Sequence, residues 1–366
     1  MQEPVVEKYP LNQIYFYLTE GCNLHCRHCW IAPKYQDSKH TYPSLPFNLF
    51  QSIIKQARPL GLAAVKLTGG EPLMHPDINN ILELIKQENL GLGIETNGVF
   101  CTPDVSRRIA ECNAPFVSVS LDGVNADTHE WVRGVKGCFN DTISGIKNLV
   151  ETGVSPQIIM TVMRHNKGQM EEMIRLAETL GASSVKFNIV QPTARGKHLH
   201  NSGETLSIEE LIHIGEWVEN ILSSSTSLKI FFGHPPAFRP LARMFGENSN
   251  GCGICGIKGI IGVLSDGSYA LCGIGESIPE MVFGNATKDR LSDVWNNTLT
   301  LKEIREKIPG HLEGVCKGCL MKNICLGSCI AQNYYRTSSL WSPFWYCEES
   351  LKLNMFPGSR LIKNDI

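Results

Sequence analysis

Three cysteines near the start of the sequence, Cys22, Cys26 and Cys29, place three thiols on one short loop. A 4Fe–4S cluster is normally held by four cysteine thiolates. Three thiolates would leave one iron open, and an open iron is a Lewis acid that a small molecule with an amine and a carboxylate can chelate. The alternative is a zinc loop, which needs a fourth ligand. The nearby candidates for that ligand are three histidines, His25, His28 and His40.

A second group of cysteines lies in the last third of the sequence. Its core is a Cx2Cx5Cx3C run, preceded by a β-hairpin predicted to turn at Asp266-Gly267. The eight cysteines of this region are Cys252, Cys255, Cys272, Cys316, Cys319, Cys325, Cys329 and Cys347. Eight thiols are enough for two further four-cysteine clusters. A single zinc ribbon built from the Cx2Cx5Cx3C run is the alternative.

Short apolar runs alternate with amphipathic segments ahead of that region, and they must position the first loop. We predict strands at residues 14–18, 63–67, 92–96, 116–120, 157–162 and 184–190, and helices near 46–58, 77–88, 140–152 and 168–180. Near-continuous apolar strands alternating with helices indicate a parallel sheet covered on its faces. The predicted fold is therefore α/β, a partial (β/α)6 barrel followed by a small cysteine-rich domain. The expected division is 1–245 for the barrel with a bridging region and 246–366 for the small domain.

The composition limits the classes of partner. The chain has 366 residues and a net charge of −2, so no bulk attraction to nucleic acid or to an anionic membrane is expected. No apolar run reaches membrane length, and the first residues are not those of a signal peptide. Fourteen cysteines in a reducing cytoplasm indicate metal ligands rather than disulfides. We therefore expect a cytoplasmic protein.

The CxxxCxxC loop after a first strand, together with Gly69-Gly70-Glu71-Pro72 after the second, resembles the radical SAM superfamily. The resemblance implies a 4Fe–4S cluster on the loop, with S-adenosylmethionine (SAM) bound at its open iron. It also implies that the residues from Gly69 to Pro72 contact the SAM amino group. Further SAM contacts would come from Thr96, Asn97, Ser120 and Asp122, and Arg133 would face the SAM carboxylate. For the polar residues at strand ends, helix capping is the alternative role.

The C-terminal cysteine pattern resembles the SPASM extension of radical SAM proteins, whose hairpin ends in Gly-x4-Cys before Cx2Cx5Cx3C and a last cysteine. The resemblance implies two auxiliary 4Fe–4S clusters, and hence three in all. The inner cluster would use Cys252, Cys255, Cys272 and Cys329. The outer cluster would use Cys316, Cys319, Cys325 and Cys347. Whether both Cys252 and Cys255 bind the inner cluster is left open.

Proteins with this extension act mostly on peptides, so we expect a maturase of a ribosomally made precursor peptide. Gly273 follows Cys272 where sulfatase-maturing relatives carry an acidic residue, which argues against that activity. The Cys26–Pro33 segment and the aromatic tail from Tyr334 to Cys347 are similar to spliceases that excise a tyramine unit. The aromatic tail is predicted either to line a peptide channel or to belong to the core.

The expected partners are an electron donor such as flavodoxin or ferredoxin and a separate leader-peptide-binding protein. The second follows because strand one begins near residue 14, too early for a leader-binding module within the chain. The alternative activity is modification of tetrapyrrole side chains in a haem pathway. A protein of another class, a non-catalytic iron–sulfur electron carrier, would not need the Gly69–Pro72 motif.

Overall fold

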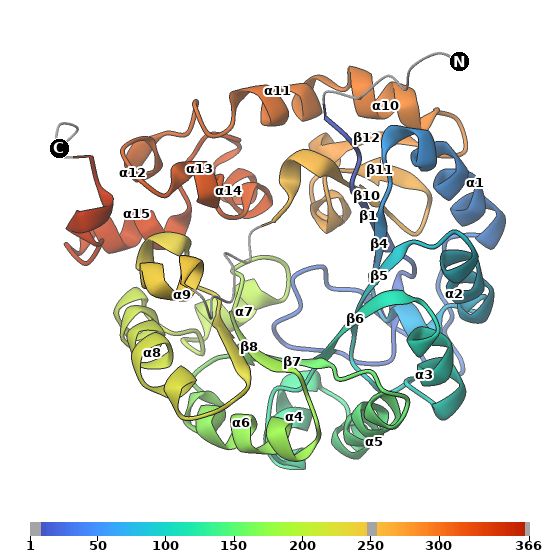
Figure 1. The fold of residues 1–366 in the computed structure, drawn as a ribbon, viewed down its shortest axis with the longest axis horizontal. Helices are drawn as coiled ribbons and strands as arrows, with labels where there is room; N and C mark the ends of the chain where they lie inside the picture. The colour runs from blue at the N-terminus through green and yellow to red at the C-terminus, as the bar shows by residue number, and fades with distance from the viewer. Residues whose placement is uncertain (1–8, 247–254, 363–366) are drawn as a thin grey trace.

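The computed structural model describes residues 9–246 and 255–362, and its centre is a curved ten-stranded sheet (Figure 1). The strand order is β12-β11-β10-β1-β4-β5-β6-β7-β8-β9. Eight neighbouring strands from β10 to β9 pair in parallel, and only β11 and β12 run antiparallel. The central strands are β1 (Gln13–Tyr17), β4 (Ala64–Thr68), β5 (Gly91–Thr96), β6 (Asn113–Ser120), β7 (Gln157–Val162) and β8 (Ser184–Ile189). All six correspond to strands predicted from the sequence.

The outer face of the sheet is apolar because alternate residues of each strand point towards a layer of helices. Ile14 and Phe16 of β1 are fully buried, and the Phe16 ring lies 4.4 Å from the Phe50 ring, centroid to centroid. The helices of this layer are α1 (Phe47–Ala57), α2 (Ile78–Gln87), α3 (Pro103–Ala110), α4 (Ala126–Arg133), α5 (Cys138–Glu151), α6 (Met170–Thr179) and α8 (Ile208–Asn220). Figure 1 shows these helices around the outside of the curved sheet.

The inner face of the sheet is polar and encloses a cavity of about 350 Å³. Its lining includes Tyr15, Lys66 and Glu95, which alternate along their strands with the buried apolar residues. Lys66 and Glu95 form a salt bridge. The barrel is therefore a half-cylinder with a cavity along its inner face.

A seventh barrel strand, β9 (Lys229–Phe232), extends the sheet beyond β8 and was not predicted. Ahead of it, α8 is followed by a short turn of 3-10 helix. The run Lys-Ile-Phe-Phe is only four residues long and follows a serine-rich stretch. It forms a strand because β8 offers a free edge for parallel pairing.

The C-terminal region is joined to the barrel through the sheet itself. β10 (Ile260–Val263) pairs in parallel with β1, with Gln13 opposite Ile260, and turns back through Gly267 (φ 84°) into β11 (Ser268–Ala270). The remaining elements are β12 (Val282–Asn285), α10 (Leu291–Asn297), α11 (Leu299–Lys307), α12 (Gly314–Lys317), α13 (Lys322–Cys325), α14 (Ile330–Thr337) and α15 (Trp345–Lys352). The boundary predicted at 245/246 adjoins the undescribed residues 247–254 and stays a prediction.

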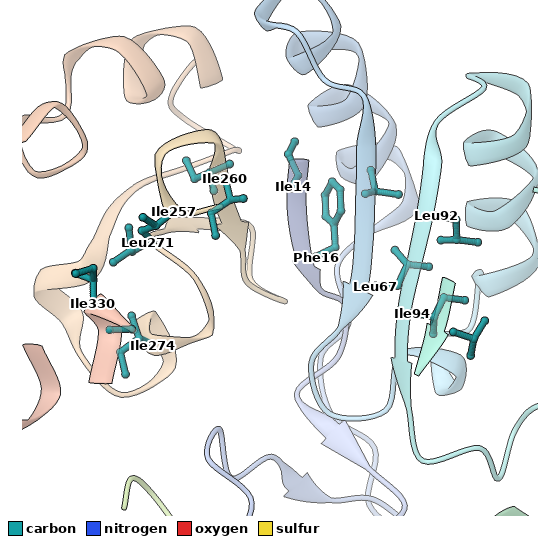
Figure 2. Close-up of a cluster of buried hydrophobic side chains, with 14 of the residues drawn as sticks. Ile14, Phe16, Leu67, Leu92, Ile94, Ile257, Ile260, Leu271, Ile274 and Ile330 are labelled. Carbon is teal, nitrogen blue, oxygen red and sulfur yellow. The ribbon is translucent and has the colours of Figure 1, made fainter. Parts of the chain in front are cut away.

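One hydrophobic core joins the two regions. Ile14, Phe16 and Leu67 belong to the same buried cluster as Ile260 and Ile330 (Figure 2). Within residues 9–246 and 255–362, no helix has both the length and the apolar character needed to cross a membrane.

Candidate functional site

The loop with the first three cysteines leaves β1 at its carboxyl end, where parallel barrels carry their chemistry. Two backbone hydrogen bonds attach the loop to the end of α4. His25 N–H donates to the carbonyl of Arg133 at 3.0 Å, and Arg27 N–H donates to the carbonyl of Val132 at 2.9 Å. Gly134 permits this approach, because a Cβ there would lie 2.6 Å from the His25 carbonyl oxygen. These contacts hold the loop against the end of α4.

The thiols of this loop are buried and interact with one another. Cys22 and Cys26 are 6% and 7% exposed, and Cys29 packs beside them. Burial raises the pKa of the Cys22 thiol, and Cys26 and Glu71 raise it further. Hydrogen-bond donors point at two of the sulfurs: Leu24 N–H lies 3.4 Å from Cys22 Sγ, and Arg133 Nη1 lies 3.4 Å from Cys26 Sγ. Cationic iron would relieve the cost of ionising these thiols, so this donor set fits a cluster.

The zinc alternative finds no support in the part of the chain that the structure describes. Among those residues, no three His, Cys, Asp or Glu side chains converge closely enough to hold one metal ion. A zinc ion would need its sulfur ligands about 2.3 Å from a single centre. A cubane cluster instead binds each cysteine through a different iron, so its ligands stand further apart.

Gly69 and Gly70 form a cradle directly against the cysteine loop. Gly70 N–H donates to Thr19 O, and Glu71 N–H donates to Gly21 O, each at 3.0 Å. A Cβ on Gly70 would lie 1.9 Å from the Gly21 carbonyl oxygen. Gly69 has φ 119°, which a residue with a side chain rarely adopts. The end of β4 and the approach to Cys22 therefore touch backbone to backbone.

The Glu71 side chain connects this cradle to the end of β5. Its carboxylate accepts hydrogen bonds from Thr96 Oγ1 at 2.7 Å, Asn97 N–H at 2.9 Å and Leu73 N–H at 3.1 Å. Burial raises the pKa of Glu71 to about 7, although these donors act in the opposite direction. Pro72 begins the short 3-10 turn that Glu71 caps. Glu71 therefore organises the strand ends.

Asn97 reaches from β5 to the cysteine loop. Its Nδ2 donates to Asn23 Oδ1 at 2.7 Å and lies 4.0 Å from Cys22 Sγ. Thr96, beside it, is occupied by Glu71 and by the Gly98 N–H. Both residues thus lie at the end of β5 beside the cysteine loop, and Asn97 is the one that contacts it. Their contact with SAM stays a prediction.

Asp122 and Arg133 form a buried ion pair beside the loop, with Asp122 Oδ2 2.7 Å from Arg133 Nη2. Burial alone would raise the pKa of Asp122, but the Arg133 guanidinium and His28 hold it below its ordinary value. The helix-cap alternative for Asp122 does not apply to α4, whose cap is Asn125 with its side chain 3.0 Å from Thr128 N–H. Ser120 lies half-buried at the end of β6. Arg133 is thus bound to Asp122 and to Cys26 Sγ.

The segment after β8 also covers the cysteine loop, and sequence reasoning did not single it out. Arg195 N–H donates to the Cys29 carbonyl at 3.2 Å, just before α7 (Gly196–Asn201). Burial, with help from Arg133 and Arg195 and against the effect of Asp122, lowers the pKa of the nearby His28 to about 4. No periodicity or motif identifies Arg195 as a site residue. The only signal in the sequence is that it follows a predicted barrel strand.

The C-terminal cysteines separate into two groups in the described residues. One group surrounds a cavity with apolar side chains such as Phe344 and Phe356; its cysteines are Cys316, Cys319, Cys325 and Cys347. In the other group, burial and then the charge of Cys329 raise the pKa of Cys255 to about 11. Burial, Cys329 and Cys255 likewise raise the pKa of Cys272, so the three thiols lie close enough for their charges to interact. Cys252 lies outside the described residues. The grouping corresponds to the one expected for an outer and an inner cluster, and ligation itself stays a prediction.

Gly273 links the inner group to the first loop. A Cβ on Gly273 would lie 2.4 Å from Tyr17 Cε1 and 2.8 Å from Trp30 Cη2. Tyr17 ends β1, and Trp30 directly follows Cys29. The aromatic side chains therefore fill the space that an acidic residue at position 273 would need.

The aromatic tail divides between a cavity and the core, and its role in a peptide channel stays a prediction. Trp345 lines a cavity of about 190 Å³ together with Val162, Ile189 and Leu211, at the carboxyl ends of β7 and β8. Tyr346 is fully buried in the core. This cavity forms a groove between the barrel and the C-terminal helices α14 and α15.

Known proteins resemble the chain over nearly its whole length. It is 28% identical to an AdoMet-dependent heme synthase of Methanosarcina barkeri, covering 90% of this chain and 94% of that protein. It is 26% identical to the mycofactocin maturase MftC of Mycobacterium ulcerans, covering 89% and 85%. Streptococcus suis SuiB, solved with SAM, shares the fold with a TM-score of 0.72 at 18% identity, covering 95% and 79%; SuiB has also been solved with its precursor peptide SuiA.

The family matches follow the same division as the two cysteine regions. Residues 16–177 match the radical SAM superfamily, and residues 252–320 match the SPASM iron–sulfur cluster-binding domain. The chain is therefore a radical SAM enzyme whose catalytic domain is followed by a SPASM domain.

Proposed function

We propose that the enzyme modifies a ribosomally made precursor peptide. The observation that carries the proposal is the convergence of the three-cysteine loop, the Gly69–Gly70 cradle and Asn97 at adjacent strand ends. When bound together, the cluster and SAM supply a 5′-deoxyadenosyl radical that abstracts a hydrogen atom from the substrate.

The roles of the chain's own residues follow from their positions. Cys22, Cys26 and Cys29 would hold the first cluster, and Arg133 would stabilise the Cys26 sulfur by its hydrogen bond. The backbone carbonyls of Gly69 and Gly70 would accept hydrogen bonds from the SAM ammonium group. Neither glycine has a side chain, so this backbone lies directly against the cysteine loop. Asn97, Ser120 and their neighbours would orient the rest of SAM.

Two auxiliary clusters complete the proposal. The outer one would be held by the four cysteines around the apolar cavity, and the inner one by Cys255, Cys272 and Cys329, with Cys252 as the fourth candidate. Anaerobically reconstituted enzyme should then contain about twelve irons per chain. Replacing Cys22, Cys26 and Cys29 together by alanine should remove about four irons and all SAM cleavage; retained SAM cleavage would refute the assignment.

A peptide substrate is supported by the relatives and by the groove. MftC is named as a maturase, and SuiB binds a precursor peptide. The groove beside Trp345 opens at the ends of β7 and β8 and is lined by apolar side chains and by the Arg336–Glu349 ion pair. Such a groove suits an extended chain with an aromatic residue. Backbone tyramine excision is the narrower reaction that we propose.

Tetrapyrrole side-chain modification is the second candidate, favoured by the 28% identity to a heme synthase. The deciding experiment incubates reconstituted enzyme, SAM and reductant with either a neighbouring precursor peptide or a propionate-bearing tetrapyrrole. Mass change of the peptide and none of the tetrapyrrole is expected. Tetrapyrrole turnover without peptide turnover would overturn the proposal.

We propose two protein partners for the reaction in the cytoplasm. A flavodoxin or ferredoxin would supply the electron, and a separate protein would bind the leader of the precursor by strand addition, which raises the local concentration of the core peptide. Turnover of full-length precursor should rise when that protein is added. Equal rates with and without it would show that the enzyme needs no such partner.

A further inference from the structure

We propose that Arg195, together with Thr193, forms a carboxylate-binding subsite at the barrel mouth, beside the cysteine loop. Neither residue belongs to the CxxxCxxC loop, the Gly69–Pro72 motif or the C-terminal cysteine pattern. The subsite deepens the proposed function, because it predicts that SAM or the substrate binds through a carboxylate at this position.

The subsite is held in place by the cysteine loop. Arg195 N–H donates to the Cys29 carbonyl at 3.2 Å. The next residue, Gly196, leaves no space for a side chain, since a Cβ there would lie 2.1 Å from the Gln191 carbonyl oxygen and 3.5 Å from that of His28. The Arg195 side chain therefore starts from a fixed backbone at the edge of the reaction site.

The Arg195 guanidinium has donors that no described residue satisfies. Its Nε and Nη2 are shielded from solvent and have no hydrogen-bond partner in the described part of the chain. The same holds for Thr193 Oγ1, on a residue that is 2% exposed. N–H donors that are shielded from solvent and have no acceptor are unfavourable, because folding removes their water and supplies nothing instead. An anionic ligand would supply the missing acceptors.

The acid beside His28 already has a cationic partner. Asp122 is 2.7 Å from Arg133 and 3.8 Å from His28 Nε2, and no salt bridge to Arg195 occurs among the described residues. Arg133, the cation expected to face the SAM carboxylate, is in turn bound to Asp122 and Cys26. Arg195 is thus a cation beside the loop whose charge the protein leaves unmatched.

The chemistry of the reactants favours a carboxylate over other anions. A guanidinium binds a carboxylate through two parallel N–H donors, and a hydroxyl can add a third contact. SAM carries a carboxylate, a peptide carries carboxylates on its side chains and terminus, and the alternative tetrapyrrole carries propionates. The shared group is the same, so experiment must identify its source.

The first arm of the test measures SAM binding to reconstituted enzyme without reductant, so that no turnover occurs. Affinities for SAM and decarboxylated SAM are compared in the wild type, Arg195→Gln and Arg195→Lys. Arg108→Gln is the matched control, because Arg108 is an arginine of α3 that pairs with Asp104 on the surface. If the ligand is SAM, Arg195→Gln should weaken SAM binding by about tenfold or more and leave decarboxylated SAM unchanged.

The second arm measures KM for whichever of the precursor peptide and the tetrapyrrole is turned over. If the ligand is the substrate, Arg195→Gln should raise KM by about tenfold with little change in SAM affinity. For a substrate whose carboxyl groups are amidated, the variant and the wild type should have the same KM. Iron content verifies the fold, and Arg195→Lys, which keeps the charge but loses the fork, should give an intermediate effect.

Unchanged affinity for SAM together with unchanged KM for the substrate, in variants with full iron content, would overturn the subsite. Failure of the peptide proposal gives a different result, namely tetrapyrrole turnover, with Arg195 still testable in both arms.

Discussion

Gly70 is the residue at which the two SAM-site motifs meet, and its lack of a side chain has a measurable consequence. Gly70→Ala would press a Cβ to within 1.9 Å of the Gly21 carbonyl oxygen, one residue before Cys22. Because backbone must move, we expect a loss of about 1–3 kcal/mol in unfolding free energy. We also expect reduced iron at the first cluster, measured by iron content and EPR.

Gly168→Ala is the matched control for that change, since a Cβ at Gly168 meets nothing within 4 Å. If Gly70→Ala retains full iron and stability and loses only SAM binding, the clash is relieved elsewhere. The residue would then act on the ligand alone.

Glu71 should make stability depend on pH near neutrality. Its pKa is about 7 in the folded protein and near 4.5 when unfolded, so the folded state binds an extra proton between these values. The contribution of Glu71 to stability should therefore fall as pH rises from about 4.5 to 7 and level off above. The measurement is the unfolding free energy of the wild type minus that of Glu71→Gln, taken from pH 5.5 to 8. We expect this quantity to fall as pH rises, and a rise with pH would contradict the prediction.

At this scale the sequence identified the residues but not their contacts. Spacing alone brought Cys22, Cys26 and Cys29 onto one loop, because the three are local. The binding of Arg133 to Asp122 and Cys26 joins three separate elements, and no pattern of residues encodes it. Arg195 escaped notice for the same reason.

Among the elements, α8 offers a direct test because it forms one wall of the groove. Its first turn carries a capping box in which Ser207 Oγ accepts from Glu210 N–H at 3.2 Å and Glu210 Oε2 accepts from Ser207 N–H at 2.9 Å. Ser207→Ala should lower unfolding free energy by about 1 kcal/mol, and Ser207→Thr by much less. Chemical denaturation measures the unfolding free energy of both variants. Threonine keeps the capping hydroxyl and alanine removes it, so equal losses in the two variants would mean that the hydroxyl cap does not stabilise α8.

The elements themselves were largely predictable. Apolar runs bounded by glycine and polar residues predicted the six central strands, because parallel strands covered on both faces consist mostly of apolar residues. β9 was missed because four residues carry too little signal. The pairing of β10 with β1 was missed because nothing local links residues so distant in sequence.

For the whole molecule, the division of the C-terminal cysteines predicts two independent clusters. Cys272→Ala should lose the iron of one cluster and Cys319→Ala that of the other, about four irons each, with additive loss in the double variant. Iron analysis and EPR of the three variants measure this. Loss of both clusters from either single substitution would show that the two groups form one unit.

The parallel pairing of β10 with β1 also affects the order of events while the protein is being made. The ribosome completes β1 first, yet the neighbour on one of its edges appears only when residue 260 has been synthesised. At typical elongation rates, that edge stays bare for roughly 10 to 50 seconds. Until then the loop with Cys22 lacks the packing of Trp30 against Gly273. We therefore expect iron to be loaded after release of the full chain, and a nascent chain stalled before residue 260 to depend on chaperones that shield an open strand.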